Sequence, residues 1–411
     1  MSPPPIITTE TSQATLEERV ERVGEELGQA FAAVIAAVPG GPHGTVELAR
    51  RLDIDKVLSS RILKAARSRN PMAVAHLMPG PDPLRRVLRG ASGQRVPMEL
   101  VDRAERAVRR FEQLIRSEAG DRSGLDTIIA AWLPSARAEF EVRRKQAAFK
   151  AMSQIKGVMA QTNLSAVIVA PSHDNPARLD VIWVFGLLGL HRLRPGASVK
   201  LATRRIASPD GPRHPRTLED HPVADLSGLL LDRFCSRPLP AFDVMESGDV
   251  VHYTLAGDAF GPRSAVDFVL AESNRAEIPR AVPAGSGRRA YFFSEVSTPS
   301  RRLQYDVFVH DDVYPGAEPE LILYDTAFEG VANVNDRGRD IDRLDMGESI
   351  QLLGRGSSRW PAPEISNYAD LLGEVFTRLG WSPDSFRGYR SRIEYPIYGS
   401  QVTMAFVPPE A

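Results

Sequence analysis

Apolar residues recur at helical spacing through roughly the first 160 positions of the chain. Between Leu16 and Val38 the early positions are acidic and the later ones apolar. The Pro-Gly-Gly-Pro sequence at 39–42 then ends the pattern, so a first helix is expected there. Residues 97–117 form a second helical pattern, and a third runs from Leu125 to Met159 with an interruption near Pro134. The first part of the chain is therefore predicted to be helical.

The pattern changes at about Leu164 to short runs of β-branched and aromatic residues separated by Pro, Gly, Asp and Ser. The runs that predict strands are residues 165–172, 180–188, 198–205, 250–257, 264–272, 289–297, 303–312, 320–328 and 400–407. One amphipathic helix is expected from Tyr368 to Leu379, closed by Gly380. A helical N-terminal part and a β-rich C-terminal part together predict the α+β class.

Residues 45–68 (TVELARRLDIDKVLSSRILKAARS) consist of two short helical patterns around the turn at 53–55. Thr45 is the expected N-cap of the first helix. The residues expected to point inward are Val46, Leu48, Ala49, Leu52, Val57, Leu58, Ile62, Leu63 and Ala66, with Ile54 closing the turn. This segment resembles the motif of bacterial helix-turn-helix regulators, mainly in ELARRLDIDK and SSRILKA. The resemblance implies that the second helix enters the major groove of DNA.

Two positions depart from the pattern of those regulators. Asp53 stands where the turn usually has glycine, and Ser59 lies near a position that is usually apolar. The polar residues of the second helix, together with Thr45, are the candidate DNA-binding residues: Thr45, Lys56, Ser59, Ser60, Arg61, Lys64 and Arg67.

The charge distribution agrees with a DNA-binding segment. Residues 45–110 contain fifteen Lys and Arg against seven Asp and Glu, a balance of about +8, whereas the whole chain has a net charge of −1. A basic segment in an otherwise acidic protein is expected to attract the phosphate backbone of double-stranded DNA. The alternative is an ordinary solvated helix face in an arginine-rich protein.

The pattern predicts four regions: a disordered tail at 1–14, a helix-turn-helix domain at 15–95, a helical connector at 96–160 and a β-rich effector or partner-binding domain at 161–411. Within the second region, the basic stretch at 84–89 follows a proline-rich turn and forms either a wing or a short helix. The connector carries an apolar seam formed by Val101, Ala104, Val108, Phe111 and Ile115. This seam either forms a homodimer interface, as helix-turn-helix proteins need for two half-sites, or packs on the chain's own core.

Composition restricts the class of protein further. The chain has 43% hydrophobic and 25% charged residues and no run of about eighteen apolar residues, so a soluble protein without membrane contact is expected. The first residues lack the features of a signal peptide. The single cysteine, Cys235, excludes an intrachain disulfide and suits a reducing cytoplasm.

Candidate chemistry is sparse in this sequence. The eight histidines include no pair at the helical metal-site spacing and no HExxH motif. The best cluster is His310-Asp311-Asp312, with His173 and Asp174 as further candidates, although two aspartates after a strand commonly cap a turn. Residues 333–338 resemble the start of a calcium loop, but Arg337 stands where an oxygen ligand is required. No catalytic residue, metal or cofactor is assigned.

Two further groups of residues have a functional and a structural interpretation. Residues 387–392 join arginines to Tyr389 and form either a contact with an acidic ligand or a nucleic acid or, more simply, a basic surface loop. Five aromatic residues either line a pocket or belong to the core: Trp183, Phe185, Trp360, Tyr395 and Tyr398.

These features predict a cytoplasmic DNA-binding transcriptional regulator whose C-terminal domain senses a small molecule or a protein effector. The alternative is an enzyme or an assembly protein whose activity lies in the β-rich domain and whose N-terminal helices are scaffold.

Overall fold

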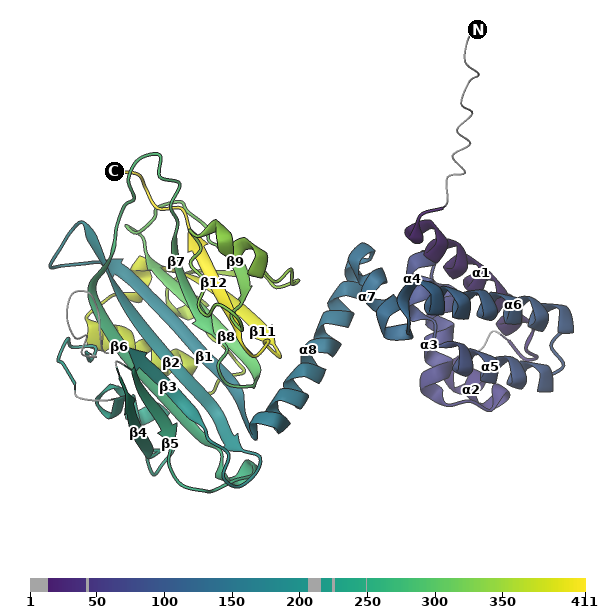
Figure 1. Cartoon of the computed structure of the whole chain (residues 1–411), viewed down its shortest axis with the longest axis horizontal. Coiled ribbons are helices and arrows are strands. Elements are labelled where there is room, and N and C mark those ends of the chain that lie inside the picture. The colour runs from purple at the N-terminus through teal and green to yellow at the C-terminus, as the bar shows by residue number, and fades with distance from the viewer. Residues whose placement is uncertain (1–13, 42–43, 206–215, 224–225, 249) are drawn as a thin grey trace, which may run out of the picture. The chain divides into compact units, whose positions relative to one another are not determined.

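The computed structural model describes residues 14–41, 44–205, 216–223, 226–248 and 250–411. The chain forms two compact units, Met1–Glu141 and Val142–Ala411, called here the helical unit and the β-rich unit (Figure 1). The fold class is α+β, as the sequence predicts. Within the described residues, no helix is both long and apolar enough to cross a membrane.

The first helix, α1 (Leu16–Ala37), confirms the predicted one. The Thr15 hydroxyl accepts a hydrogen bond from the backbone N–H of Glu18, whose carboxylate accepts one from the Thr15 N–H. This capping box fixes the start of the helix. The predicted tail lies almost entirely outside the described residues, which begin at Ala14.

Six further helices, α2 to α7, and one π-helix complete the helical unit. An eighth helix, α8, leads into the β-rich unit. They are α2 (Thr45–Leu52), α3 (Lys56–Arg67), α4 (Pro71–Leu77), α5 (Pro81–Gly93), α6 (Met98–Leu114), the π-helix Ile115–Ala119, α7 (Arg122–Trp132) and α8 (Pro134–Lys156). The basic stretch at 84–89 therefore lies in a helix, α5, and not in a wing. The boundary between the units falls within α8, so the predicted connector is divided between them.

The apolar seam of the predicted connector belongs to the core of the helical unit. Val101, Ala104, Val108, Phe111 and Ile115 are all buried in the cluster to which α1 and α5 contribute. The seam thus packs against the chain's own core and offers no apolar surface to which a second copy could bind. A homodimer stays a prediction that this seam does not support.

Two glycines allow helices of this unit to pack closely. A Cβ atom on Gly24 of α1 would lie 2.0 Å from the carbonyl oxygen of Pro71 at the start of α4. A Cβ atom on Gly90 of α5 would lie 2.2 Å from the carbonyl oxygen of Leu52 at the end of α2. Any side chain at these two positions would therefore force the helix backbones apart.

A six-stranded mixed sheet is the centre of the β-rich unit. Its order is β10 (Gln351–Arg355), β11 (Phe386–Glu394), β8 (Ser300–His310), β1 (Val158–Pro171), β2 (Arg178–Arg192) and β6 (Val266–Pro279). The central strands β1 and β8 are parallel, with Ala160 opposite Ser300, and the other pairs are antiparallel.

Two smaller sheets and one helix complete the unit. The sheets are β7 (Ala290–Glu295), β12 (Ser400–Phe406) and β9 (Glu320–Asp325), and β3 (Lys200–Arg205), β5 (Val250–Leu255) and β4 (Phe242–Ser247). The helix is α9 (Tyr368–Leu379), which ends at Gly380 in the left-handed conformation, as predicted. All nine segments predicted as strands contain one, whereas β4, β10 and β11 lie outside those segments.

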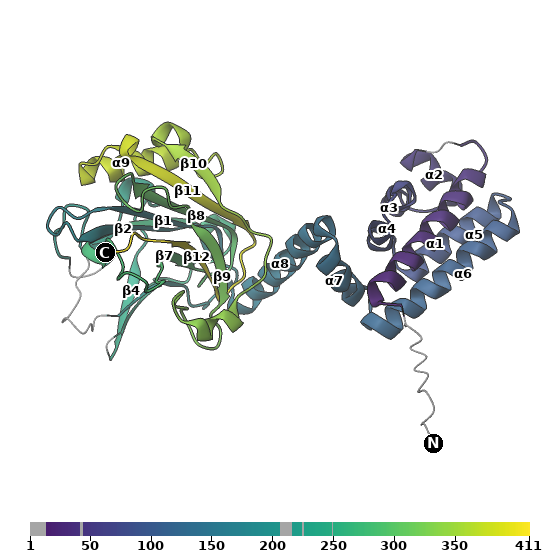
Figure 2. The ribbon, with the colours of Figure 1, turned by 90° about the horizontal axis from the view of Figure 1, so that it is seen from above.

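The large sheet is covered on both faces (Figure 2). On β1, Leu164, Ala166 and Ile168 face the cluster that contains the apolar residues of α9. Val167 and Val169 alternate with them and face the cluster formed with β7 and β12. Because side chains on a strand alternate between faces, one strand supplies both cores, and β1 is buried along nearly its whole length.

A buried ion pair joins β8 to β11. The guanidinium of Arg390 donates from Nε to Asp306 Oδ1 at 2.9 Å and from Nη2 to Oδ2 at 2.7 Å. Tyr368 of α9 donates to the same carboxylate at 2.6 Å, and Arg390 also donates to the carbonyl oxygens of Trp360 and Pro361. The prediction of a basic surface loop at 387–392 is therefore wrong. These residues form β11, and Arg390 anchors the segment before α9.

Candidate nucleic-acid interface

Helices α2 and α3 are joined by a three-residue turn whose conformation explains its unusual sequence. Asp53, the C-cap of α2, adopts the left-handed conformation (φ 51°, ψ 50°), which is why glycine is common at this position. Asp55 caps α3, since its carboxylate accepts a hydrogen bond from the Leu58 N–H at 2.8 Å. Ile54 lies between them, partly buried against the core, as predicted.

Two of the candidate DNA-binding residues serve the packing of the motif. Ser59 is fully buried, and its hydroxyl donates to the carbonyl oxygen of Thr45 at 2.8 Å. This contact ties the start of α2 to α3 and satisfies a polar group inside the core. Thr45 is the first residue of α2 and half-buried, and its predecessor Gly44 is the N-cap. Ser59 is therefore buried and does not belong to the exposed face of α3. The prediction of Thr45 as the N-cap of α2 is wrong by one residue.

The remaining candidates share one exposed face of α3. Lys56, Ser60, Lys64 and Arg67 recur at intervals of four, four and three residues, and Arg61 lies beside them. Val57 was expected in the core but is 71% exposed next to Lys56 on this side of the helix. Val46 of α2 is likewise exposed and not buried. The surface of α3 thus combines four cations, a hydroxyl and one apolar side chain.

Several arginines of the helical unit bind carboxylates. Arg50 and Arg51 both contact Glu47, Arg85 contacts Glu105 and Glu112, and three more pairs follow the same rule: Arg19–Glu118, Arg110–Glu26 and Arg116–Glu112. Lys56, Arg61 and Lys64 contact no carboxylate among the residues that the structure describes. Their charge is therefore available to an external anion.

Comparison with known proteins adds no relative to this picture. No family model, curated protein or solved structure matches the chain. The likeness to helix-turn-helix regulators accordingly rests on residues 45–68 alone.

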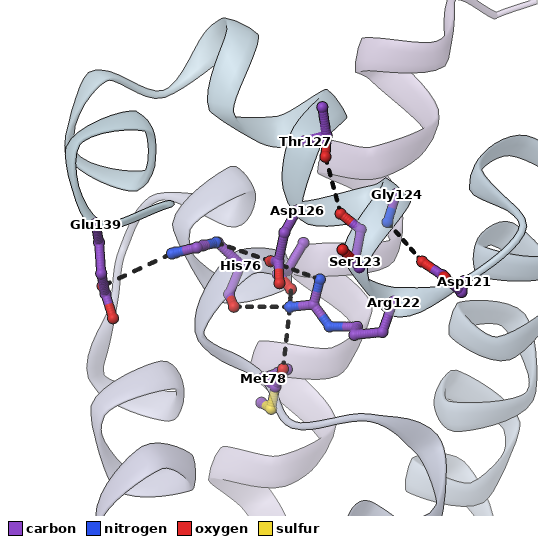
Figure 3. A network of polar contacts seen from close by, with 10 residues as sticks. His76, Met78, Asp121, Arg122, Ser123, Gly124, Asp126, Thr127 and Glu139 are labelled. Carbon is purple, nitrogen blue, oxygen red and sulfur yellow. Dashed lines mark hydrogen bonds and ion pairs between the residues drawn. The ribbon is translucent and has the colours of Figure 1, made fainter. Parts of the chain in front are cut away.

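A second polar cluster in the helical unit is structural (Figure 3). His76, at the end of α4, is buried, with Nδ1 3.1 Å from Asp126 of α7 and Nε2 3.8 Å from Glu139 of α8. Arg122 donates to the carbonyl oxygens of Ala75, His76 and Met78, and so caps the C-terminus of α4. No sequence pattern indicates this cluster, because its members lie far apart along the chain.

The candidate catalytic or metal-binding residues do not converge on a site. At the end of β8, His310 Nδ1 accepts a hydrogen bond from the Asp312 backbone N–H at 3.1 Å, and Asp311 pairs with Arg355 at 3.1 Å. His173 is fully exposed and lies 3.5 Å from its neighbour Asp174. Within the described part of the chain, no three His, Cys, Asp or Glu side chains gather as metal ligands would.

The remaining candidates have structural contacts. Asn333 and Asp336 accept hydrogen bonds from nearby backbone N–H groups, as in ordinary turns, which agrees with the rejection of a calcium loop. Cys235 is buried against the backbone of Val269, and burial raises the pKa of its thiol, so it is a poor nucleophile.

The predicted group of five aromatic residues does not form one pocket. Trp360 is in the core and packs on Phe308, as the structural interpretation predicted. Tyr395 packs on Phe149, and Tyr398 lies under the ammonium group of Lys156. These contacts assign the aromatic residues mainly to packing.

Proposed function

We propose that this chain is a cytoplasmic regulator that binds double-stranded DNA through α3, and that the β-rich unit senses a small molecule or a protein effector. The observation that carries the proposal is the row of exposed cations on α3, of which Lys56, Arg61 and Lys64 contact no carboxylate among the described residues, whereas several other arginines of the unit do. An exposed cation that no internal anion neutralises is suited to phosphate.

The order of side chains along α3 supports a reading helix. In helix-turn-helix proteins the N-terminal part of the second helix reaches base edges, and the flanking cations contact phosphates. Lys56, Val57, Ser60 and Arg61 occupy the first two turns of α3, and Lys64 and Arg67 follow. An exposed valine suits the methyl group of thymine, and arginine suits guanine. Val57 thus gains a role that its sequence pattern did not indicate.

The test is the affinity of the full chain for a random pool of duplex DNA, measured by fluorescence anisotropy over a range of salt concentrations. We expect a steep fall of affinity with salt, because each phosphate contact releases a counterion. The double substitution Arg61→Ala/Lys64→Ala should weaken binding at least tenfold, since one base-contacting arginine is worth about 1–3 kcal/mol. It should also make the salt dependence less steep.

A matched control removes two charges elsewhere in the same unit. Arg106 and Arg109 are exposed residues of α6, which packs on α1 and α5. The double substitution Arg106→Ala/Arg109→Ala should change the affinity less than threefold. Equal losses for both pairs would indicate a mere effect of net charge, and unchanged affinity after Arg61→Ala/Lys64→Ala would refute α3 as the contact helix.

A further inference from the structure

A pocket of about 650 Å³ opens in the β-rich unit between the edges of two sheets. One wall is the end of β6 with Ile278 and Pro279, and the other is β7 with Ala290, Tyr291 and Phe293. Val282 and Pro283 of the connecting segment and Pro408 after β12 complete the apolar lining. The volume and the mainly apolar lining are those of a site for a small organic molecule.

The aromatic wall offers a flat surface. The rings of Tyr291 and Phe293 are nearly parallel, with centroids 6.4 Å apart and an angle of 29°. Trp183 of β2 packs against Phe293 in an edge-type contact, with ring centroids 6.3 Å apart, and so supports the position of that ring. Burial raises the pKa of Tyr291, so its hydroxyl stays neutral near pH 7. A planar ligand can therefore stack on this wall without meeting a charge there.

Two guanidinium groups lie in the same lining. Arg288 is exposed at the rim, and its side chain has no partner among the residues described. Arg289 is held by Glu320 at 2.6 Å and by the carbonyl oxygen of Ala405, whereas its buried Nε–H donates to no described group. One carboxylate, Glu277, also lines the pocket and has contacts of its own. Because Glu320 already pairs with Arg289, Arg288 is the guanidinium group that remains for an external anion.

Hydrogen bonds hold this pocket open. Asn335 binds the backbone of Arg289 on both sides, through Oδ1 at 2.7 Å and Nδ2 at 3.0 Å. Val282 pairs with the backbone of the last residues, donating to Pro409 and accepting from Ala411. Arg178 donates to the carbonyl oxygen of Glu277 at 2.7 Å. A cavity whose walls are fixed before binding loses little entropy on binding.

From these features we infer that the pocket binds a small planar carboxylate, with its ring system on Tyr291 and Phe293 and its carboxylate on Arg288. This inference does not rest on DNA binding by α3, because a different unit and different residues carry it. It specifies a small molecule as the effector of the β-rich unit.

The experiment measures binding of 1-naphthoate to the full chain, without DNA, by isothermal titration calorimetry. We expect saturable binding of one equivalent, at least tenfold tighter than that of the neutral 1-naphthamide. Arg288→Ala should weaken naphthoate binding at least fivefold. Arg263→Ala, which removes another exposed arginine of the same unit, should change it less than twofold.

A second variant keeps the test decisive. Ala281 lines the pocket, so Ala281→Trp should fill it and abolish binding, while the far-ultraviolet circular dichroism shows that the chain remains folded. The inference is overturned if the folded wild-type chain shows no saturable binding of naphthoate, or if naphthamide binds equally well. It is also overturned if neither Arg288→Ala nor Ala281→Trp affects binding.

Discussion

Replacing Asp306 by alanine is expected to destabilise the β-rich unit by about 3–5 kcal/mol. The carboxylate is fully buried and accepts hydrogen bonds from Arg390, Tyr368 and Gln304. Its removal leaves the guanidinium of Arg390 charged inside the core, where water cannot replace the lost partner. Urea unfolding followed by tryptophan fluorescence measures the loss, because Trp360 packs next to this network and its carbonyl oxygen accepts from Arg390.

The same pair of strands provides the control. Arg302 of β8 and Glu394 of β11 form an ion pair at 2.7 Å, but both side chains are partly exposed. Glu394→Ala should therefore cost less than about 1 kcal/mol, since a solvated ion pair contributes little. Similar losses for Asp306→Ala and Glu394→Ala would contradict the stabilising role of the buried pair. Partial recovery in Asp306→Leu/Arg390→Met would confirm that the unpaired charge causes the loss.

The substitution Gly24→Ala is expected to destabilise the helical unit by about 1–3 kcal/mol, although alanine is the better helix former. The added methyl group would meet the carbonyl oxygen of Pro71 at 2.0 Å, and a backbone atom cannot move aside without shifting α4. Thermal and urea unfolding of this variant and of Gly28→Ala measure the effect.

One turn further along α1, Gly28→Ala should have the opposite sign. Its methyl group would lie 3.5 Å from the methyl groups of Val74, an ordinary contact, so the gain in helix propensity of about 1 kcal/mol remains. If both substitutions stabilise the unit, α1 and α4 are not as closely packed as described. If both destabilise it equally, the effect comes from the helix itself and not from the contact with Pro71.

The sequence predicts a helix or strand well where its hydrophobic period and its terminal residues indicate the same boundaries. Helix α9 was found from Tyr368 to Leu379 because its apolar face and the terminal Gly380 give the same boundary. Strand β11 was missed because Arg387, Arg390 and Arg392 suggest an exposed loop. Each of these arginines has a partner on another segment, and such pairings are invisible in a single segment of sequence.

Within the candidate interface, the sequence correctly predicts the turn and the exposed cations, but not which of the neighbouring residues are buried. Val57 and Ser59 exchanged their expected places: the valine is exposed and the serine is buried. The period of a helix cannot separate such positions when they lie at the border between its two faces. The hydrogen bond from Ser59 to the Thr45 carbonyl decides the rotation of α3, and only the pairing of two helices creates it.

The pocket of the β-rich unit lay beyond sequence analysis for a related reason. Its lining comes from segments around 280, 290, 335 and 408, which the sheets bring together. In the sequence Asn335 indicates only a calcium-like loop, whereas in the structure its side chain fixes the backbone of Arg289. A long-range contact of this kind leaves no periodic signal.

The parallel pairing of β1 with β8 has a consequence for the order in which the chain folds. Ala160 lies opposite Ser300. The two central strands can therefore pair only after about 140 further residues have followed Ala160 out of the ribosome. Contacts of such long sequence separation slow folding, whereas the helical unit uses mainly local ones. During synthesis the helical unit should fold first. Until α9 and β12 have been synthesised, the apolar residues of β1 lack the elements that cover both faces of the sheet.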